Sequence, residues 1–335
     1  MRTTHSSGRE TSAALRRLAV LLLALATVAL GSVGSAAAAR PGGASVTGAT
    51  TVSADQTFGV AMPDVPWTMA PLSALTASVG RAPTSVMWYA AWSDNAAFPA
   101  AQAADVAATG ATPTITWEPW NPAGGATQPA YTLDRITAGA FDSYLTSWAR
   151  QIRSYGKPVV LRFAHEMNGS WYPWSAQANG NTAGDYVAAW KHVRSVFSKQ
   201  RTSNVVWSWS PNVPYPGSTA LGAVYPGDGY VDQVALDGYN WATLQGGSWQ
   251  SFWEVFGSGV AQLTALTSKP LYLGEVGCPE DGGDKAAWVA DMFSTLATHQ
   301  EIRGFTWFDF QKEADWRIES STATLDAFRA GLSTY

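Results

Sequence analysis

Two glutamates each stand at the end of an apolar segment of the chain. Glu166 follows the run 158–164 and Glu275 follows the run 271–274, so each carboxylate is placed where a buried strand should end. Two carboxyl groups on different strands can cleave a glycosidic bond: one protonates the leaving oxygen, and the other attacks the anomeric carbon or activates water. Large rings beside a carboxylate indicate a sugar ligand. Three of them follow Glu166: Trp171, Tyr172 and Trp174.

Other chemistries fit the same residues less well. His165-Glu166 begins like the zinc motif H-E-x-x-H, but Gly169 stands where the second histidine should be. Cys278 is the only cysteine, which excludes a thiolate metal cluster and an intrachain disulfide. We therefore expect no metal and no cofactor. Asn168-Gly-Ser170 matches a glycosylation sequon, which we interpret as coincidence because it lies in the presumed catalytic loop.

Composition narrows the class of partner. The chain has 335 residues, of which 46% are hydrophobic and 14% charged, with a formal net charge of -4. Such a chain can bury a large core, but it has no basic field with which to hold nucleic acid. It also carries 17 tryptophans, so some of them should lie outside the core. We expect a monomer that binds neither nucleic acid nor, in its mature form, a membrane.

The N-terminal part has the features of an export signal. Residues 1–39 combine a basic start, an apolar run at 18–30 and small residues at 36–39. The apolar run is too short to span a bilayer, so we expect a secreted, extracellular protein. Residues 40–56 are small and polar and should form a flexible leader, which leaves residues 57–335 as the folded domain.

The folded part alternates between two patterns. Segments with helical periodicity, such as 140–155 and 185–197, separate short runs rich in β-branched and aromatic residues. Strand then helix, eight times, predicts a single (β/α)8 TIM barrel of the α/β class, and runs that are apolar throughout are typical of its buried parallel strands. The eight runs are Thr57–Met62, Ser85–Trp92, Thr112–Trp120, Pro158–His165, Asn204–Asn212, Val231–Trp241, Leu271–Cys278 and Arg303–Phe310.

Active sites of such barrels lie at the carboxyl ends of the strands. Those ends carry carboxylates and indoles here, which a packing role does not easily explain. Alternation along a strand puts Arg162 and Glu166 on one side of the fourth run, and Leu271, Leu273 and Glu275 on one side of the seventh. If those sides face the barrel axis, the two glutamates face each other across the mouth.

Three segments resemble a known family. Arg162-Phe-Ala-His-Glu-Met-Asn-Gly169, followed by Trp171 and Trp174, is similar to the signature of glycoside hydrolase family 26, a retaining clan-A family of (β/α)8 barrels. Leu236–Asn240 and Leu271–Gly277 agree with it. The resemblance extends from about Thr57 to the C-terminus.

The resemblance implies different catalytic roles for the two glutamates. Glu166 would be the general acid and later the general base, and Glu275 the nucleophile that forms a glycosyl-enzyme. Burial beside Trp171 and the charge of Glu275 would keep Glu166 protonated. A hydrogen bond from Tyr239 and the charge of Arg162 would keep Glu275 ionised.

Other residues near the strand ends are expected to support the two glutamates. His165 would orient the acid or a sugar hydroxyl, which requires a distortion at the strand end. Trp171 and Trp307 match aromatic positions that the family uses to hold the sugar, and Glu118 should bond substrate hydroxyls or Arg162. Asp237 and Asp309 should be structural. Further rings could form subsites or simply fill the barrel: Trp88, Trp92, Trp117, Trp120, Trp174, Trp209 and Trp241.

The resemblance leaves the substrate open, because the family acts on β-mannans, on mixed-linkage β-1,3-1,4-glucans and on β-1,3-xylan. Its mannanases usually carry a further histidine in the mouth, whereas His5 is the only histidine here before His165. Trp117–Trp120 and Trp171–Trp174 are more similar to the glucanases. We predict a retaining endo-β-glycanase acting on mixed-linkage β-glucan, with endo-β-1,4-mannanase and β-1,3-xylanase as alternatives. A non-catalytic carbohydrate-binding barrel is the alternative from another class, although it would be expected to lack one of the two carboxylates.

Overall fold

The computed structural model describes residues 56–335. The expected signal peptide at 1–39 lies outside the described residues, and so does the expected leader at 40–56 apart from Gln56. Within the described part, no helix has both the length and the apolar character needed to cross a bilayer.

Eight parallel strands close into one barrel in chain order, with β1 pairing to both β2 and β8. Each strand overlaps one of the eight predicted runs, so the predicted (β/α)8 architecture is confirmed. The strands are β1 (Thr57–Ala61), β2 (Ser85–Ala91), β3 (Thr112–Glu118), β4 (Val159–Phe163), β5 (Val205–Trp209), β6 (Gln233–Tyr239), β7 (Leu271–Gly277) and β8 (Ile302–Phe308).

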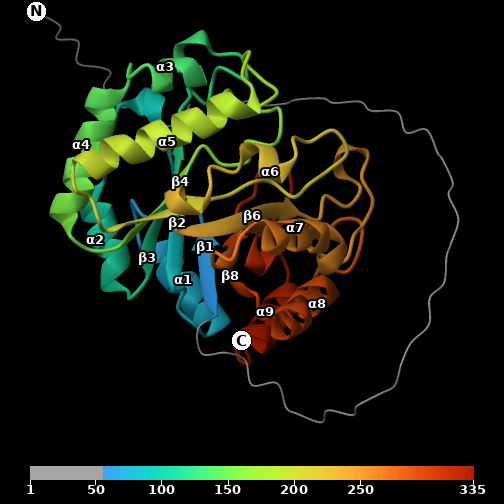
Figure 1. Ribbon diagram of the computed structural model, residues 1–335. Helices are drawn as coiled ribbons and strands as arrows, with labels where there is room; N and C mark the ends of the chain where they lie inside the picture. The colour runs from blue at the N-terminus through green and yellow to red at the C-terminus, as the bar shows by residue number, and fades with distance from the viewer. Residues whose placement is uncertain (1–55) are drawn as a thin grey trace, which may run out of the picture.

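Helices surround the barrel (Figure 1). The two segments predicted from helical periodicity are α4 and α5. The helices of the described part are α1 (Ala70–Val79), α2 (Ala100–Ala108), α3 (Leu133–Thr137), α4 (Asp142–Tyr155), α5 (Ala183–Lys199), α6 (Leu221–Val224), α7 (Phe252–Leu266), α8 (Lys285–Thr298) and α9 (Thr322–Leu332).

Local sequence sets where several of these helices begin and end. Thr182 and Asp185 form a capping box at the start of α5, in which each side chain bonds the other residue's backbone N–H. Ser251 and Glu254 do the same for α7. Gly156 ends α4 in the left-handed conformation that glycine adopts most easily.

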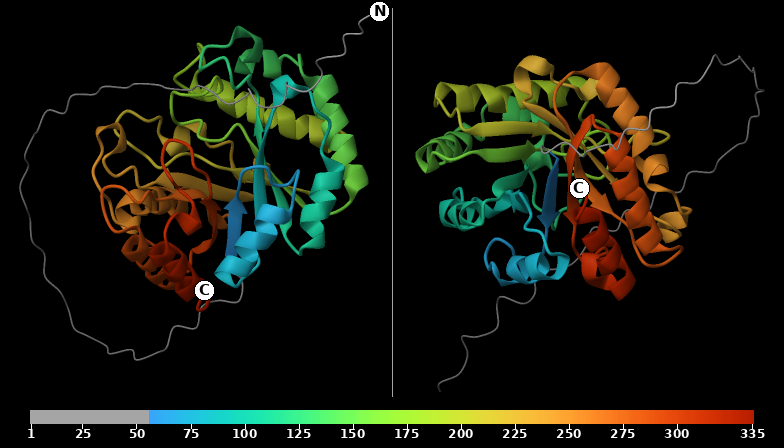
Figure 2. Two further views of the ribbon diagram at one scale, coloured as in Figure 1. Left: turned by 180° about the vertical axis from the view of Figure 1, so that it is seen from behind. Right: turned by 90° about the horizontal axis from the view of Figure 1, so that it is seen from below.

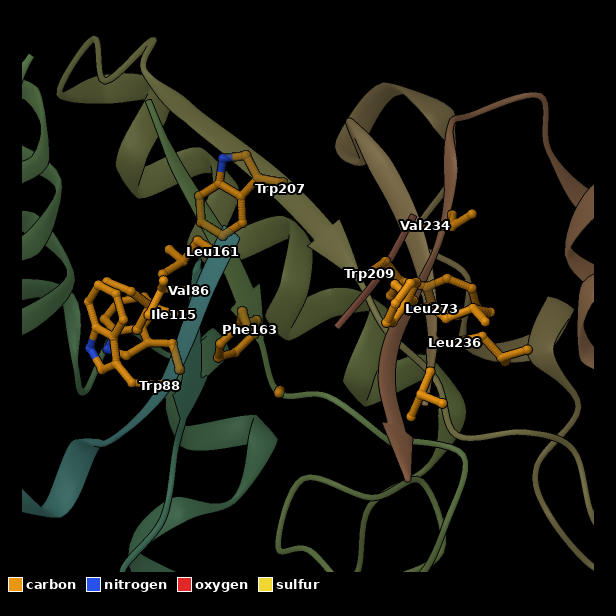
Figure 3. Close-up of a cluster of buried hydrophobic side chains, with 14 of the residues drawn as sticks. Val86, Trp88, Ile115, Leu161, Phe163, Trp207, Trp209, Val234, Leu236 and Leu273 are labelled. Carbon is orange, nitrogen blue, oxygen red and sulfur yellow. The ribbon is translucent and has the colours of Figure 1, made fainter. Parts of the chain in front are cut away.

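The main core lies between the strands and the helices. Alternate residues of each strand point outwards into this layer, part of which is shown in Figure 3. The last helix, α9, packs against both α8 and α1 and so completes the ring of helices; the views in Figure 2 show it beside them. The remaining strand residues point into the barrel, and at the carboxyl ends of the strands they form the site described next.

Candidate active site

Arg162 lies at the centre of the barrel mouth. It is on β4, is only 2% exposed, and its guanidinium contacts Asp237 at 2.6 Å and Glu275 at 3.1 Å. Thr116 and Ser210 accept further hydrogen bonds from it. Burial alone would lower the pKa of Arg162, but the two carboxylates overcome that effect and raise it. The mouth therefore has a permanent positive charge, and Asp237 has the structural role predicted for it.

Glu275 faces the charge of Arg162 because of an irregularity in β7, not because of regular strand alternation. Leu273 pairs with Leu236, and both point outwards into the core shown in Figure 3. The next residue pair is Glu275 with Asp237, so Gly274 is an extra residue, a β-bulge. The prediction that Leu271 and Leu273 share the side of Glu275 is wrong. The bulge reverses the phase of the strand and turns Glu275 inwards.

Gly274 is a residue that this bulge requires. A Cβ at position 274 would collide with Asp237 Oδ1 and would lie 2.7 Å from Ser210 Oγ. Any larger residue would therefore push against a partner of Arg162. Close packing against Asp237 and Ser210 thus explains why a glycine precedes Glu275.

Three donors surround the Glu275 carboxylate, which is 4% exposed. The Tyr239 hydroxyl donates to Oε2 at 2.5 Å, and the Tyr89 hydroxyl donates to Oε1 at 2.9 Å. Arg162 Nη1 also donates to Oε1. Such a set complements a negative charge on Glu275, as a nucleophile requires. The expected contacts from Tyr239 and Arg162 are present, whereas Tyr89 was missed; its place on the inward side of β2 could have suggested it.

Glu166 is held differently, on a distorted loop that follows β4. Ala164 and Glu166 both have positive φ angles, 47° and 52°, which non-glycine residues seldom adopt. Gly169 lets the indole of Trp171 fold back over the loop, since a Cβ there would lie 2.5 Å from the ring. The indole N–H donates to Glu166 Oε2 at 2.8 Å.

The environment of Glu166 suits a proton donor. Burial, and secondarily the charge of Glu275, raise the pKa of Glu166 to about 7, although the hydrogen bond from Trp171 opposes the shift. A glutamate with this pKa can be protonated or ionised near neutral pH, as a residue that serves first as acid and then as base must be.

His165 directly precedes Glu166, and its ring is buried. The strand distortion that its predicted role requires is present in the positive φ angles on either side of it. Its ring centre lies 4.9 Å from that of Tyr172 and 6.2 Å from that of Tyr89. Burial, and then the charge of Arg162, keep the pKa of His165 well below its usual value, so the imidazole is neutral at pH 7.

Two predicted tryptophans support this region from behind. Trp174 is fully buried and donates its indole N–H to the carbonyl of His165 at 2.6 Å. Its ring stacks on Tyr172 at 4.3 Å, and Trp120 packs edge-on against both. Trp120 is 7% exposed. These two tryptophans therefore hold the loop and Tyr172 in place, while Tyr172 and Trp171 keep accessible surface.

Glu118 is a third carboxyl group at the mouth. It ends β3 and is 5% exposed, and burial raises its pKa to about 8. The guanidinium of Arg162 bonds Asp237 and Glu275 but not Glu118, and its Nε has no partner among the described residues, so the predicted bond between Glu118 and Arg162 is not formed. A bond from Glu118 to a substrate hydroxyl stays a prediction.

Trp307 does not lie at the mouth, which corrects the sequence prediction. Alternation along β8 turns Phe308 towards the barrel and Trp307 outwards, where it packs edge-on against Phe328 of α9. The ring nearest Tyr239 on this side belongs to Trp316, on the loop after β8. The same outward orientation removes four other candidate platforms, each less than 5% exposed: Trp88, Trp92, Trp117 and Trp209.

The accessible rings at the mouth are a smaller set. Trp241 remains half-buried, as a subsite ring would be. Tyr215, on the loop between β5 and α6, is 36% exposed and stacks on Trp171 at 5.9 Å. Sequence reasoning missed Tyr215, because nothing in its local sequence distinguishes it from any other loop tyrosine.

Asn168 and Asp309 both bond the protein backbone. Asn168 of the sequon is fully buried and exchanges hydrogen bonds with the backbone of Asn212, so it is a structural residue. Asp309 accepts a hydrogen bond from the backbone of Ile318. Among residues 56–335, no group of three or more His, Cys, Asp or Glu side chains could hold a metal ion.

Comparison with known proteins points to one family. The family model described as Glycosyl hydrolase family 26 matches residues 105–274. Over 224 residues the chain is 38% identical to Endoglucanase H of Acetivibrio thermocellus. The aligned region covers 65% of this chain and 24% of that protein. Over 151 residues it is 28% identical to a mannan endo-1,4-beta-mannosidase of Bacillus subtilis strain 168, covering 44% of this chain and 38% of that protein.

Solved structures share the fold at low sequence identity. The catalytic domain of an endo-beta-1,4-mannanase of family 26 from Bacillus sp. JAMB-750 aligns with a TM-score of 0.66 at 20% identity, covering 84% of this chain and 87% of that one. The Bacillus subtilis mannanase man26 aligns with a TM-score of 0.59 at 19% identity, covering 82% and 84%.

Proposed function

Since the chain belongs to glycosyl hydrolase family 26, we propose that it is a retaining endo-β-glycanase that hydrolyses mixed-linkage β-1,3-1,4-glucan. The observation that carries the catalytic part is the contrast between the two buried carboxyl groups. Glu166 has a pKa raised to about 7, whereas Glu275 is surrounded by Tyr89, Tyr239 and Arg162 as donors. One group is suited to deliver a proton and the other to attack as an anion.

The first step of the proposed reaction forms an ester. The Glu275 carboxylate attacks the anomeric carbon, the glycosidic bond breaks, and the Glu166 carboxylic acid gives its proton to the leaving oxygen. Forming the ester removes the negative charge of Glu275. Because that charge helps to raise the pKa of Glu166, the pKa of Glu166 falls in the intermediate, which favours its ionised form.

The second step reverses these roles. The Glu166 carboxylate takes a proton from a water molecule whose oxygen attacks the anomeric carbon, and the ester bond to Glu275 breaks. The sugar is released with its original anomeric configuration. Arg162 stays charged throughout and stabilises Glu275 whenever it is an anion.

Two observations support glucan as the substrate. The chain is similar over 224 residues to a protein named Endoglucanase H. In addition, His165 is the only histidine at the mouth among the described residues. The other two lie in the helix layer: His192 on α5 pairs with Asp142 on α4, and His299 follows α8 and stacks on Trp253. The mouth thus differs from that of the family's mannanases, which usually carry a second histidine.

Endo-β-1,4-mannanase is the second candidate. It is favoured by the similarity to the Bacillus subtilis mannosidase and to structures of mannanases. A relative named Beta-1,3-xylanase TXYA from Vibrio sp. is 24% identical over 212 residues, which makes xylan a weaker third candidate.

The deciding experiment measures reducing ends released from lichenan, carboxymethyl cellulose, glucomannan, mannan and xylan, side by side. We expect lichenan to be cleaved fastest, with internal cleavage seen as an early fall in viscosity. The Glu275→Gln variant is the control that assigns the activity to this site. Fastest cleavage of mannan would select the second candidate, and binding of a polysaccharide without release of reducing ends would favour the non-catalytic alternative.

The proposal includes export and a monomeric state. Residues 1–39 have the pattern of an export signal, and the enzyme's polymeric substrate lies outside the cell. We expect the N-terminus of the protein recovered from culture medium to lie near Arg40. Size-exclusion chromatography coupled to light scattering should give the mass of a single chain.

A further inference from the structure

Lys285 is a buried ammonium outside the catalytic mouth. It is the first residue of α8 and is 1% exposed. Its Nζ donates to the carbonyl oxygens of Asp315 at 3.2 Å and Arg317 at 2.8 Å, and to Ser320 Oγ at 2.8 Å. These three acceptors match the three donors of an ammonium group.

Helix formation does not explain a lysine at this position. A cation at the first turn of a helix lies at the positive end of the helix dipole, and burying it costs further free energy. The contacts of Lys285 instead serve the loop 309–321 between β8 and α9. Without its charge and donors, two backbone carbonyls of that loop would lose a buried partner.

Those carbonyls flank a single residue, Trp316. The carbonyl of Trp316 itself accepts a hydrogen bond from the indole of Trp307 at 2.8 Å, and its N–H donates to the carbonyl of Phe310 at 2.9 Å. Three successive carbonyls, at 315, 316 and 317, are therefore held by Lys285 and Trp307. The backbone position of Trp316 is fixed from both sides.

Trp316 in turn supports the nucleophile's surroundings. Its ring centre lies 5.2 Å from that of Tyr239, and it packs edge-on against Trp241 at 5.4 Å. The Tyr239 hydroxyl is the donor to Glu275 Oε2. A continuous series of contacts thus runs from the ammonium of α8, through Trp316 and Tyr239, to the carboxylate of Glu275.

We propose that Lys285 is a positioning residue of the active site: it fixes residues 315–317 so that Trp316 holds the Tyr239 ring, and hence its hydroxyl, against Glu275. This inference rests on the proposed function only in taking Glu275 as the nucleophile. The arrangement of the loop can be tested without any assay of activity.

The first test is amide hydrogen exchange. Lys285→Met keeps an unbranched side chain only one atom shorter and removes the charge and the donors. Lys199→Met is the matched control because Lys199 is the exposed last residue of α5. We expect exchange across 309–321 to become roughly tenfold faster in the first variant and to stay unchanged in the second. Unchanged exchange of this loop in a folded Lys285→Met protein would overturn the proposal, whatever the enzyme's activity.

The second test is a double-mutant cycle with Tyr239→Phe. If Lys285 acts through the Tyr239 hydroxyl, Lys285→Met should lower kcat about tenfold in the native background with KM nearly unchanged, and hardly at all in Tyr239→Phe. Effects that multiply in the double variant would overturn the proposal. A native enzyme that releases no reducing ends would overturn the proposed function instead, and the exchange result would still decide the role of Lys285.

If Lys285→Met does not fold, Trp316→Phe replaces it in the cycle. The smaller ring keeps an apolar side chain at 316 but leaves part of the Tyr239 ring without support. We expect the same loss of effect when Tyr239 is already phenylalanine. Full multiplicative behaviour of Trp316→Phe and Tyr239→Phe would refute the series of contacts on which the inference depends.

Discussion

The end of β4 and the end of β7 present the same side chain in two opposite environments. Glu166 sits on a distorted loop, buried against aromatic rings, and accepts a hydrogen bond from the Trp171 indole. Glu275 sits within a strand and accepts hydrogen bonds from Tyr89, Arg162 and Tyr239. Burial without a cationic partner favours a neutral carboxyl, whereas converging donors favour an anion.

This difference is produced by backbone geometry as much as by side chains. Two residues with left-handed backbone conformation, Ala164 and Glu166, bring the Glu166 carboxyl to the indole of Trp171 on the same loop. A one-residue bulge at Gly274 turns the Glu275 carboxyl towards Arg162. Each glutamate therefore depends on a local departure from regular strand geometry, and such departures are common at functional sites.

The largest effect should come from removing the anion. Glu275→Ala is expected to lower kcat by roughly 10⁵-fold or more, because no ester can form. Azide can occupy the vacated space and attack the anomeric carbon of an activated aryl β-glycoside from the side of the missing nucleophile. The product should be the α-glycosyl azide, identified by NMR. Full activity of Glu275→Ala would refute the assignment.

Removing the proton donor should have a smaller effect that depends on the leaving group. Glu166→Ala is expected to lower kcat on polysaccharide by about 10²- to 10⁴-fold, but to leave ester formation from a dinitrophenyl glycoside nearly intact, since that leaving group needs no proton. Azide should then attack the ester from the opposite face and give the β-glycosyl azide. If both variants gave the same anomer of the glycosyl azide, the assignment of different roles to Glu166 and Glu275 would be wrong.

Adding one methyl group at the bulge should disturb the position of Glu275 while leaving Glu166 in place. Gly274→Ala places a Cβ against Asp237 and Ser210, so Glu275 or its partners must shift. We expect kcat to fall by about 10²-fold, as misplacement of a reacting group by around 1 Å can cost. Gly229→Ala is the matched control, because no atom lies within 4 Å of a Cβ there. Native-like kinetics for Gly274→Ala would show that the bulge does not position Glu275.

The fold followed from the sequence because the repeated pattern was unambiguous. Eight β-branched runs separated by helical periodicity leave few arrangements other than a barrel, and the boundaries of β4 and α5 were nearly right. Both glutamates could be found for the same reason, since they interrupt apolar runs at strand ends.

The orientation of individual rings could not be found in this way. In a strand covered on both faces, inward and outward residues are equally apolar, so alternation gives no clue as to which face is which. Trp307 was placed at the mouth through the family resemblance, and alternation along β8 could not have shown that its ring points outwards. The Gly274 bulge is invisible to any argument from strict alternation, since one extra residue reverses every side chain beyond it. Tyr215 reaches Trp171 only through a loop whose path the sequence does not indicate.

The smallest predicted effect tests the electrostatics of Glu166 alone. The indole of Trp171 donates to this carboxyl and so lowers its pKa against the larger effect of burial. Trp171→Phe removes the donor, so the pKa of Glu166 should rise and the acid should stay protonated to higher pH. The alkaline limb of kcat/KM should therefore move upwards by about one pH unit. Trp253→Phe on α7, far along the chain from this loop, should leave the limb in place. A downward shift for Trp171→Phe would mean that the indole acts mainly by excluding water from Glu166, and that burial, not hydrogen bonding, sets the difference between the two carboxyl groups.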